Sequence, residues 1–353
     1  MLRVNGAMIP MRRVVSVLTV VLFCIFLSTI TASGTYIAHD NHTSSIEDIT
    51  LRDDAFHGRG GLPYIEWWYF DAKLDNGYSL TVGVQVLNIF AKGIVTARLT
   101  LYQQGSIIIK SYDKYFLRDF SASSEIPSVF IEGNQVILGT YDSLKDCFVY
   151  NVTIKVPGGG VSLHFVGCTD GWKRQQQTGD WWVVVLPRAN VTGTVTIDNT
   201  TMNVTGTGYH DHNWGISPRI ALHFGWFWGT CSSSNYTVTW AEIRTTRVTQ
   251  LPIMVVNTKD GGYLEIPSET IWFSTDNISL DHFRRVPWFF NIETITEHVF
   301  LVIDMEVLSV DHTEMLGFIN YWRYHVRCTG TIIVDGHMEQ VDGISIMEYL
   351  RFR

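Results

Sequence analysis

The sequence predicts an all-β protein made of two antiparallel β-barrels in tandem, preceded by an N-terminal hydrophobic helix. Apolar and polar residues alternate with period two along much of the chain, which is typical of strands with one buried face. Gly, Asn and Asp separate most of these stretches, and no window of a dozen residues after the N-terminus has helical periodicity. Closing a sheet removes its exposed edges, so many antiparallel strands favour barrels.

The first 33 residues are typical of a signal anchor or a signal peptide. Arg3, Arg12 and Arg13 precede a run from Val14 to Ala32 whose only polar side chains are Ser and Thr. The run is close to the ~20 residues that span a bilayer, so we expect either an uncleaved anchor or cleavage near residues 32–34. In both cases the chain after residue 34 lies outside the cytoplasm. The protein is therefore predicted to be membrane-anchored with extracytoplasmic domains, or secreted.

Glycosylation sequons and cysteines agree with export. Four cysteines follow the apolar run, an even number compatible with two disulfides, and we expect Cys147–Cys168 and Cys231–Cys328 because each pair would close within one barrel. Four free buried thiols are the alternative. Acceptor sequons for N-linked glycans begin at Asn41, Asn151, Asn190, Asn199, Asn203, Asn235 and Asn277.

The strands are expected in order along both halves of the chain. Residues 66–74 and 78–90 read as a hairpin, because Asp75-Asn76-Gly77 between them tolerates positive φ. Further strands are predicted at residues 95–101, 107–109, 135–139, 147–156, 161–166, 181–186, 193–198, 202–206, 236–244, 300–308, 321–334 and 343–350. The predicted organisation is a linker at 34–50, a first barrel at 51–218 and a second barrel at 219–353, with the junction near Pro218.

Composition excludes several classes of protein. Charged residues are 17% and hydrophobic residues 46% of the 353 residues, so global disorder is excluded. The net charge is −8 and basic residues are scattered, so nucleic acid is not an expected partner. The sequence motifs of serine hydrolases, zincins, P-loop NTPases and nicotinamide enzymes are absent. No cofactor is predicted.

A first candidate segment is Glu66-Trp67-Trp68-Tyr69-Phe70-Asp71. On a strand, Glu66, Trp68 and Phe70 share one face, and the other three residues share the opposite face. Because both faces carry aromatic rings, we expect one to fill a barrel core and the other to meet a second element or a ligand. The alternative is an aromatic core with a capping acid.

A second segment runs from Gly206 to Gly215 and contains Tyr209-His210-Asp211-His212-Asn213-Trp214. His210 and His212 share one face of a strand, but two ligands are too few for a metal, so none is predicted. A hydrogen-bonded cluster that orients side chains is favoured.

A third segment alternates along residues 236–244, where Val238, Trp240 and Glu242 share the face that is expected to point inward. A carboxyl among aromatic rings loses hydration, which raises its pKa and suits it to act as a general acid. The alternative is that Glu242 pairs with Arg244 at the rim of the barrel.

These segments together resemble the CrtC/AttH-like family, which includes carotenoid 1,2-hydratase (hydroxyneurosporene synthase). The resemblance rests on E-W-W-Y-F-D at 66–71, G-T-G-Y-H-D-H-N-W-G at 206–215, and closing strands with Tyr321-Trp322 and G-I-S-I-M-E-Y-L at 343–350. It implies two lipocalin-like barrels with a ligand pocket near their junction. Relatives hydrate a terminal isoprenoid double bond or guide cyclisations. The chain departs from the family pattern at Arg323, where an acid is common, and at the end of its closing strand, after Glu348.

The resemblance implies an acid and aromatic rings around the histidine-tryptophan motif. In the first hypothesis, Glu242 protonates an apolar isoprenoid and a water molecule held by Asp211 or His212 captures the cation. The second hypothesis is a non-catalytic lipid-binding or envelope protein. A third is a glycan-active protein that uses Glu66, Asp211 and Glu242. The predicted ligand-binding residues are Glu66, Trp68, Tyr209, His210, Trp214 and Trp240.

Overall fold

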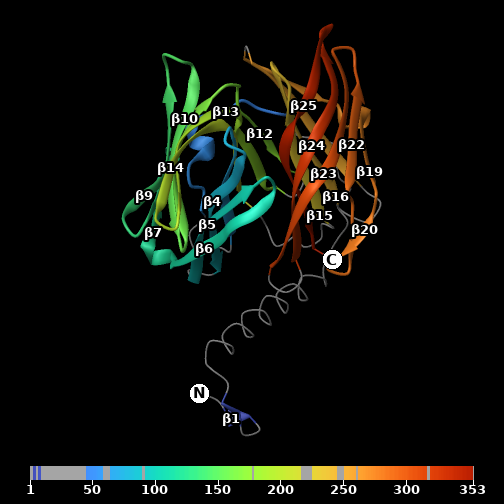
Figure 1. Ribbon diagram of the computed structural model, residues 1–353. Helices are drawn as coiled ribbons and strands as arrows, with labels where there is room; N and C mark the ends of the chain where they lie inside the picture. Colours follow the sequence, from blue (N-terminus) through green and yellow to red (C-terminus); the bar gives the residue numbers. More distant parts are fainter. Residues whose placement is uncertain are drawn as a thin grey trace, which may run out of the picture.

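The computed structural model describes residues 3–4, 7–8, 45–58, 64–89, 92–176, 179–215, 225–244, 250–259, 261–315 and 319–352. Within these ranges the protein is almost entirely antiparallel β-sheet, arranged as two nearly closed, barrel-like sheets that lie side by side (Figure 1). The predicted fold class is confirmed. The expected N-terminal helix and the junction near Pro218 lie outside the described residues.

The first sheet has the strand order β6-β5-β4-β3-β14-β13-β11-β10-β9-β8-β7, and β12 pairs with β13. The expected hairpin of β3 and β4 is present, and Gly77 in its turn has φ of +83°. The strands are β3 (Tyr64–Leu74), β4 (Tyr78–Ile89), β5 (Lys92–Gln103), β6 (Ser106–Phe116), β7 (Phe120–Ala122), β8 (Ser128–Ile131), β9 (Asn134–Asp142), β10 (Cys147–Val156), β11 (Gly159–Gly167), β12 (Trp172–Gln175), β13 (Trp181–Ile197) and β14 (Thr200–Trp214).

The second sheet has the order β18-β17-β16-β15-β25-β24-β23-β22-β19. Its strands are β15 (Gly225–Ser232), β16 (Tyr236–Arg244), β17 (Gln250–Thr258), β18 (Tyr263–Ile266), β19 (Ile271–Asp276), β22 (Phe289–Ile295), β23 (Val299–Met315), β24 (Ile319–Val334) and β25 (His337–Arg351). Smaller elements are the pairs β1 (Arg3–Val4) with β2 (Ala7–Met8) and β20 (Ser279–Asp281) with β21 (Arg284–Val286), and the 3-10 turns η2 (Leu51–Asp54), η3 (Leu117–Asp119) and η5 (Ser268–Thr270).

Three apolar clusters follow from the period-two pattern. One fills the first barrel and includes Trp68 and Phe70. A second fills the second barrel and includes Phe227 and Trp240. The third lies where the barrels meet and contains Trp172, Trp182, Val184, Tyr209, Trp228, Ala241, Ile253 and Val255. Strands β14 and β16 therefore bury both faces, one in a barrel core and one at the contact between the barrels.

Polar contacts also join the two sheets. Lys110 Nζ donates to Asp311 Oδ1 at 2.6 Å, and Ser79 Oγ lies 2.8 Å from His325 Nε2. The Trp172 indole donates to the side chain of Asn257 at 3.3 Å. A ligand between the barrels would therefore meet a surface that is already packed and hydrogen-bonded.

The expected disulfides are not present: all four described cysteines are free thiols. Cys231 and Cys328 are neighbours and their thiols hydrogen-bond, but their strands, β15 and β24, are separated by β25. Next-but-one strands lie about 9 to 10 Å apart, beyond the roughly 7 Å that a disulfide spans between Cα atoms. The Cys168 thiol donates instead to the Val166 carbonyl at 3.7 Å, and Cys147 lies near it as a free thiol.

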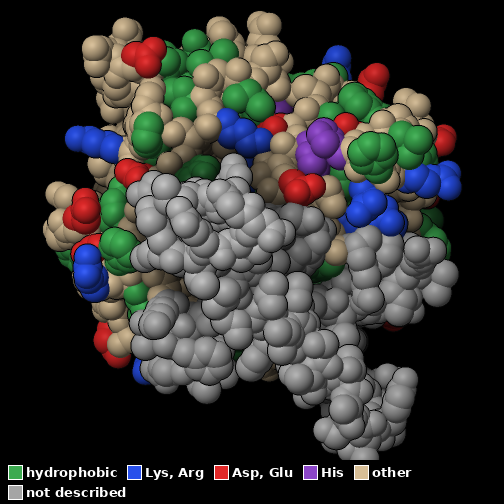
Figure 2. Space-filling view, turned by 90° about the horizontal axis from the view of Figure 1, so that it is seen from below, with side chains coloured by type: hydrophobic (Ala, Val, Ile, Leu, Met, Phe, Trp, Pro, Cys, Tyr) green, Lys and Arg blue, Asp and Glu red, His purple; other side chains and the backbone are tan. Residues whose placement is uncertain are grey.

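No helix among the described residues is long and apolar enough to cross a membrane. On the face seen in Figure 2, the Lys and Arg side chains of the described part are interspersed with Asp and Glu.

Candidate active site between the two sheets

Strand β14 places the two sets of polar residues in its histidine-rich motif on opposite faces. Tyr209 belongs to the apolar cluster between the barrels, and Asp211 and Asn213 share its face. His210 stacks on Phe70 with ring centroids 3.7 Å apart, and His212 stacks on Trp68 at 4.6 Å, both inside the first barrel. The alternation expected from the sequence is confirmed, and it separates two buried polar sites.

A cavity of about 120 Å³ lies between the two sheets. Strands β3, β13 and β14 form its wall on the first barrel, and β15, β16 and β25 form its wall on the second. Four indole rings and five carboxyl or amide side chains give it a mixed lining: Trp67, Tyr69, Gln176, Asp180, Trp182, Asp211, Asn213, Trp226, Trp228, Ala241, Ile243 and Glu348. Such a lining suits an apolar ligand with one polar or reacting end.

Asp211 is the buried carboxyl in this cavity, with 6% of its surface exposed. Its Oδ2 accepts hydrogen bonds from the Trp182 indole at 3.0 Å and the Tyr209 hydroxyl at 2.9 Å. Burial raises the pKa of Asp211 to about 7, against these two hydrogen bonds and with the help of the negative charges of Glu348 and Asp71. The carboxyl is thus close to half-protonated at neutral pH.

Arg323, where the chain departs from the family pattern, forms an ion pair with Glu348 beside this cavity. Arg323 on β24 faces Glu348 on β25 in the strand register, and Arg323 Nη2 lies 2.7 Å from Glu348 Oε1. The guanidinium also donates to Thr81 of the first barrel and lies over the Tyr69 ring. The pair bridges the barrels and brings one further carboxylate to the cavity.

A second buried site lies inside the first barrel around Asp54, the last residue of η2, which is fully buried. Its Oδ2 accepts from the Tyr150 hydroxyl at 2.6 Å and lies 3.1 Å from His210 Nε2, while its Oδ1 lies 3.3 Å from His212 Nδ1. Burial alone would raise the pKa of Asp54, but the charges and hydrogen bonds of His210 and His212 hold it well below its usual value.

Glu66 and His57 complete this inner site. Glu66 Oε1 lies 3.0 Å from His212 Nε2 and accepts the backbone N–H of His57 at 2.8 Å. Burial would lower the pKa of His212, but its hydrogen bonds to Asp54 and Glu66 raise it to about 9. Burial and the charge of His212 lower the pKa of His57 to about 4.

The structure does not bring all the predicted site residues together. Glu242 shares its face of β16 with Trp240, which is fully buried in the core of the second barrel. Burial raises the pKa of Glu242 to about 7, against the charge of Arg244, whose Nε lies 3.8 Å from Glu242 Oε1. The setting expected for Glu242, a carboxyl among indoles where two sheets meet, is found instead around Asp211.

The remaining predicted residues lie in or beside the inner site. Glu66, Trp68, His210 and His212 face the interior of the first barrel. Trp214 stacks on His57 at 3.9 Å between ring centroids and on Trp181 at 5.6 Å. Of the nine predicted residues, only Asp211 lines the cavity of about 120 Å³, which we call the tryptophan cavity. The Tyr209 hydroxyl donates a hydrogen bond to Asp211.

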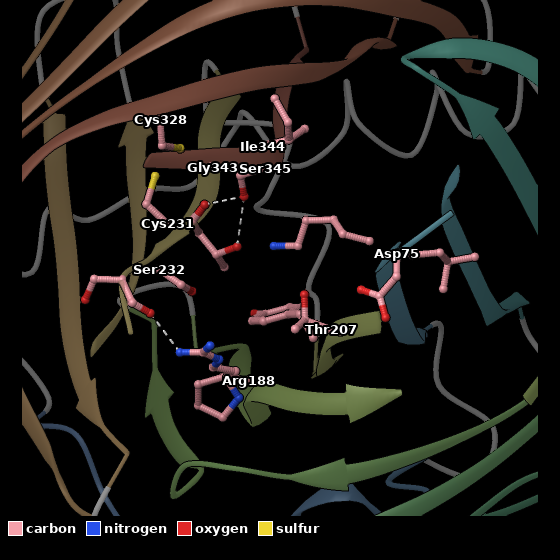
Figure 3. Close-up of a pocket in the computed structure, with 16 residues that line it drawn as sticks. Asp75, Arg188, Thr207, Cys231, Ser232, Cys328, Gly343, Ile344 and Ser345 are labelled. Carbon is pink, nitrogen blue, oxygen red and sulfur yellow. Dashed lines mark hydrogen bonds between the residues drawn. The ribbon is translucent and has the colours of Figure 1, made fainter. Parts of the chain in front are cut away.

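A larger cavity of about 320 Å³ also lies between the sheets (Figure 3). Figure 3 shows Arg188 and Thr207 from the first sheet opposite Cys231 and Ser345 from the second. Tyr209 is the one aromatic residue among its described lining. Because hydroxyls, Lys73 and Arg188 dominate the lining, this cavity suits an apolar ligand less well than the tryptophan cavity.

Comparisons with known proteins agree with this architecture. No family model matches the chain. The quinolone epoxide rearrangement protein of Emericella nidulans is 25% identical over 241 residues, which are 58% of this chain and 61% of that protein. The hydroxyneurosporene dehydrogenase of Chlorobaculum tepidum is 24% identical over 223 residues, 50% of this chain and 55% of that protein. The resemblance to the CrtC/AttH-like family is confirmed.

Solved structures with an AttH-like fold cover more of the chain. A putative AttH from Nitrosomonas europaea has a TM-score of 0.64 at 13% identity and covers 89% of this chain and 98% of its own. Kievitone hydratase from Nectria haematococca has a TM-score of 0.55 at 13% identity, with coverage of 81% and 88%. These structures share the fold, whereas the chain spans less than two thirds of the length of the curated relatives it matches.

Sequence reasoning missed several residues of the inner site. Asp54 and His57 lie in and after η2, and Tyr150 comes from β10. The one local signal was Thr50-Leu51-Arg52-Asp53, a capping pattern in which Asp53 accepts from the Thr50 backbone N–H at 2.8 Å. It could predict the turn, but not that Asp54 meets His210, 156 residues further along.

Proposed function

We propose that this protein binds the reactive end of an apolar small molecule in the tryptophan cavity and protonates it through Asp211. The observation that carries the proposal is a buried carboxyl with a pKa of about 7 that opens on a cavity walled by indole rings. Such a carboxyl holds a proton at neutral pH and can give it to a substrate as a general acid.

Protonation of an alkene or an epoxide would place positive charge on carbon, which water captures or a rearrangement relieves. Trp182, Trp226 and Trp228 line the cavity, so a cation in it would lie beside indole rings. A cation–π contact is worth ~2 kcal/mol, or about 30-fold in rate, so positioning and exclusion of bulk water must supply the rest. The hydrogen bonds from Trp182 and Tyr209 then stabilise the carboxylate that Asp211 leaves behind.

The names of two relatives fit this chemistry. One structural neighbour is a hydratase, and one curated relative is an epoxide rearrangement protein. Addition of water to an alkene and rearrangement of an epoxide can both begin with proton transfer from an acid. The cavity of about 120 Å³ has room for the end of such a molecule rather than for all of it.

The test compares two carboxyl variants, Asp211→Asn and Glu242→Gln, with farnesol and its terminal epoxide as probe substrates in ¹⁸O-labelled water. Both residues are buried and have a pKa near 7, but they lie in different places, so each controls for the other. We expect labelled product from the Glu242→Gln variant and none from the Asp211→Asn variant, with activity falling above pH 7. Turnover that is lost only in Glu242→Gln would assign the acid to Glu242 and overturn the proposal.

A non-catalytic, lipid-binding protein is the competing outcome. It predicts that mass spectrometry finds the same apolar molecule bound to wild type and to the Asp211→Asn variant, and that neither converts either probe. Catalysis predicts labelled product from wild type and none from the Asp211→Asn variant. Either result decides between the two functions.

We propose in addition that the protein is exported and glycosylated. The six sequon asparagines within the described residues are all exposed on the two barrels: Asn151, Asn190, Asn199, Asn203, Asn235 and Asn277. A glycan can be attached only to an accessible asparagine, so the exposure of every described acceptor supports glycosylation. Treatment of the protein from eukaryotic cells with peptide N-glycosidase should lower its apparent mass, and an unchanged mass would contradict glycosylation.

A further inference from the structure

The inner site of the first barrel contains more polar atoms than its hydrogen bonds use. Glu66 Oε2 and His57 Nδ1 are buried and have no hydrogen-bond partner within the described part of the chain. Glu66 itself is 1% exposed. A buried polar atom without a partner is costly, so a cluster of them suggests that a ligand belongs between them.

The three side chains around these atoms are spaced like the ligands of a metal ion. One ring nitrogen each of His57 and His212 and one carboxylate oxygen of Glu66 all lie within 4.8 Å of one another. Glu66 Oε1 lies 3.0 Å from His212 Nε2 and 3.9 Å from His57 Nδ1. Ligand atoms of a tetrahedral zinc ion are about 3.4 Å apart, given bonds of about 2.1 Å. The distances of 3.0 Å and 3.9 Å lie on either side of that spacing.

Groups outside the three candidate ligands hold two of them in place. Indole rings stack on both imidazoles, Trp214 on His57 and Trp68 on His212. The other nitrogen of His212 faces Asp54 Oδ1 at 3.3 Å, and Asp54 is itself held by Tyr150. A carboxylate behind a histidine is the usual second partner of a metal-bound imidazole.

We propose that His57, Glu66 and His212 bind one divalent transition-metal ion, with zinc as the best fit to two imidazoles and a carboxylate. The His57 side chain is 23% exposed, so an ion can reach the site from the surface. The ion ties the segment after η2 to β3 and β14 across the end of the barrel. His210 is not a ligand, because its two nitrogens face Asp54 and the Tyr69 carbonyl.

The metal site is separate from the proposed acid site. His212 and Asp211 project from opposite faces of β14, and no candidate ligand lines the tryptophan cavity. A failure of one proposal therefore leaves the other standing.

The test uses the full chain, stripped with a chelator and then titrated with Zn²⁺ by calorimetry and with Co²⁺ by visible absorption. We expect one equivalent bound, the ligand-field bands of low-coordinate Co²⁺, and a rise in melting temperature. His57→Ala should weaken binding by more than the roughly 10- to 100-fold that loss of an outer partner causes. His57 is half-buried, so its removal should leave the fold intact, which circular dichroism checks.

Two further variants keep the result decisive. Glu66→Gln preserves the shape of the side chain and should also abolish binding. His282→Ala is the control for binding by surface histidines, because His282 is exposed, stacks on His312 and contacts Asp281. It should bind Zn²⁺ like wild type. Unchanged binding in His57→Ala and Glu66→Gln, loss of binding in His282→Ala, or no binding at all would overturn the proposal.

Discussion

A buried carboxyl lies at each face of strand β14. The pKa of one is lowered from its usual value, and the pKa of the other is raised. Asp54, reached by His210 and His212 on the inner face, has its pKa held far below the usual value. Asp211, on the outer face, has its pKa raised to about 7. Both are buried, so burial does not explain the difference. The neighbouring groups explain the difference. Two imidazoles surround Asp54, whereas only neutral donors and other carboxylates surround Asp211.

This contrast divides the two sites by their chemistry. The inner face keeps its carboxylate ionised and bound, which suits structure and metal binding. The outer face keeps a proton next to an apolar cavity, which suits acid catalysis. A change that alters the partners on one face should therefore affect one site and spare the other.

The largest expected effect is from Asp54→Asn. The amide cannot neutralise the charge on His212, so the free energy of unfolding should fall by about 3 to 5 kcal/mol, as when a buried ion pair loses one partner. Urea denaturation measures this. Asp342→Asn, which breaks an exposed pair with Arg327 at 3.1 Å, is the control and should cost no more than about 1 kcal/mol. Equal losses in the two variants would contradict the inner network.

Asp211→Asn should instead raise the free energy of unfolding. A carboxyl with a native pKa of about 7 and a usual value of 3.8 keeps its proton on folding, so it favours the unfolded state increasingly as pH rises from about 4 to 7. The variant should lack this slope. The stability difference between variant and wild type should grow in favour of the variant, by up to about 4 kcal/mol between pH 4 and 8. A difference that does not change with pH would refute the raised pKa.

The protonated state of His212 gives a third test. Its native pKa of about 9 exceeds the usual 6.5, so its stabilising effect is complete below pH 6.5 and is lost as pH rises through 9. Wild type should lose roughly 3 kcal/mol over this range relative to His212→Gln, measured by denaturation with a chelator present. Parallel curves for the two proteins would mean that His212 is neutral in the native state.

The smallest expected effect is from Trp182→Phe. The indole hydrogen bond at 3.0 Å favours the ionised form of Asp211, so its loss should raise the pKa of Asp211 further, by about one unit. Carbon-13 NMR of labelled aspartate would report the shift. Trp226→Phe, which removes an indole from the same cavity, is the control and should leave the titration nearly unchanged. A downward shift in Trp182→Phe would contradict this role for the indole.

The local patterns in the sequence predicted the faces of the strands well. The alternation at 66–71 predicted one face in a barrel core and the other against a second element or a ligand. The structure places Glu66 and Trp68 inside the first barrel, whereas Trp67 and Tyr69 line the cavity between the sheets. Likewise, Trp240 and Glu242 share the inward face of β16. These predictions held because side chains alternate across a strand wherever it pairs, irrespective of the partner strand.

The same patterns could not identify the acid, because that assignment depends on contacts between residues far apart in the chain. Glu242 and Asp211 both lie among aromatic residues along the chain, and both have a pKa near 7. Only the packing of the sheets shows that Asp211 meets Trp226 and Trp228 of the other barrel, while Glu242 points away from that contact. The expected Cys231–Cys328 disulfide is absent for a similar reason, because β25 lies between the strands that carry these two cysteines.

By itself, the sequence determined that this chain is all-β, which residues alternate toward a core, and that its motifs resemble the CrtC/AttH-like family. Those properties are local, set by the two-residue repeat of a strand and by the conformations that turn residues allow. The tertiary structure alone decided which carboxyl keeps its proton and which histidines meet Asp54 and Glu66. The acidity of a buried group depends on the charges and donors within a few ångströms of it, and here these come from strands far apart in the chain.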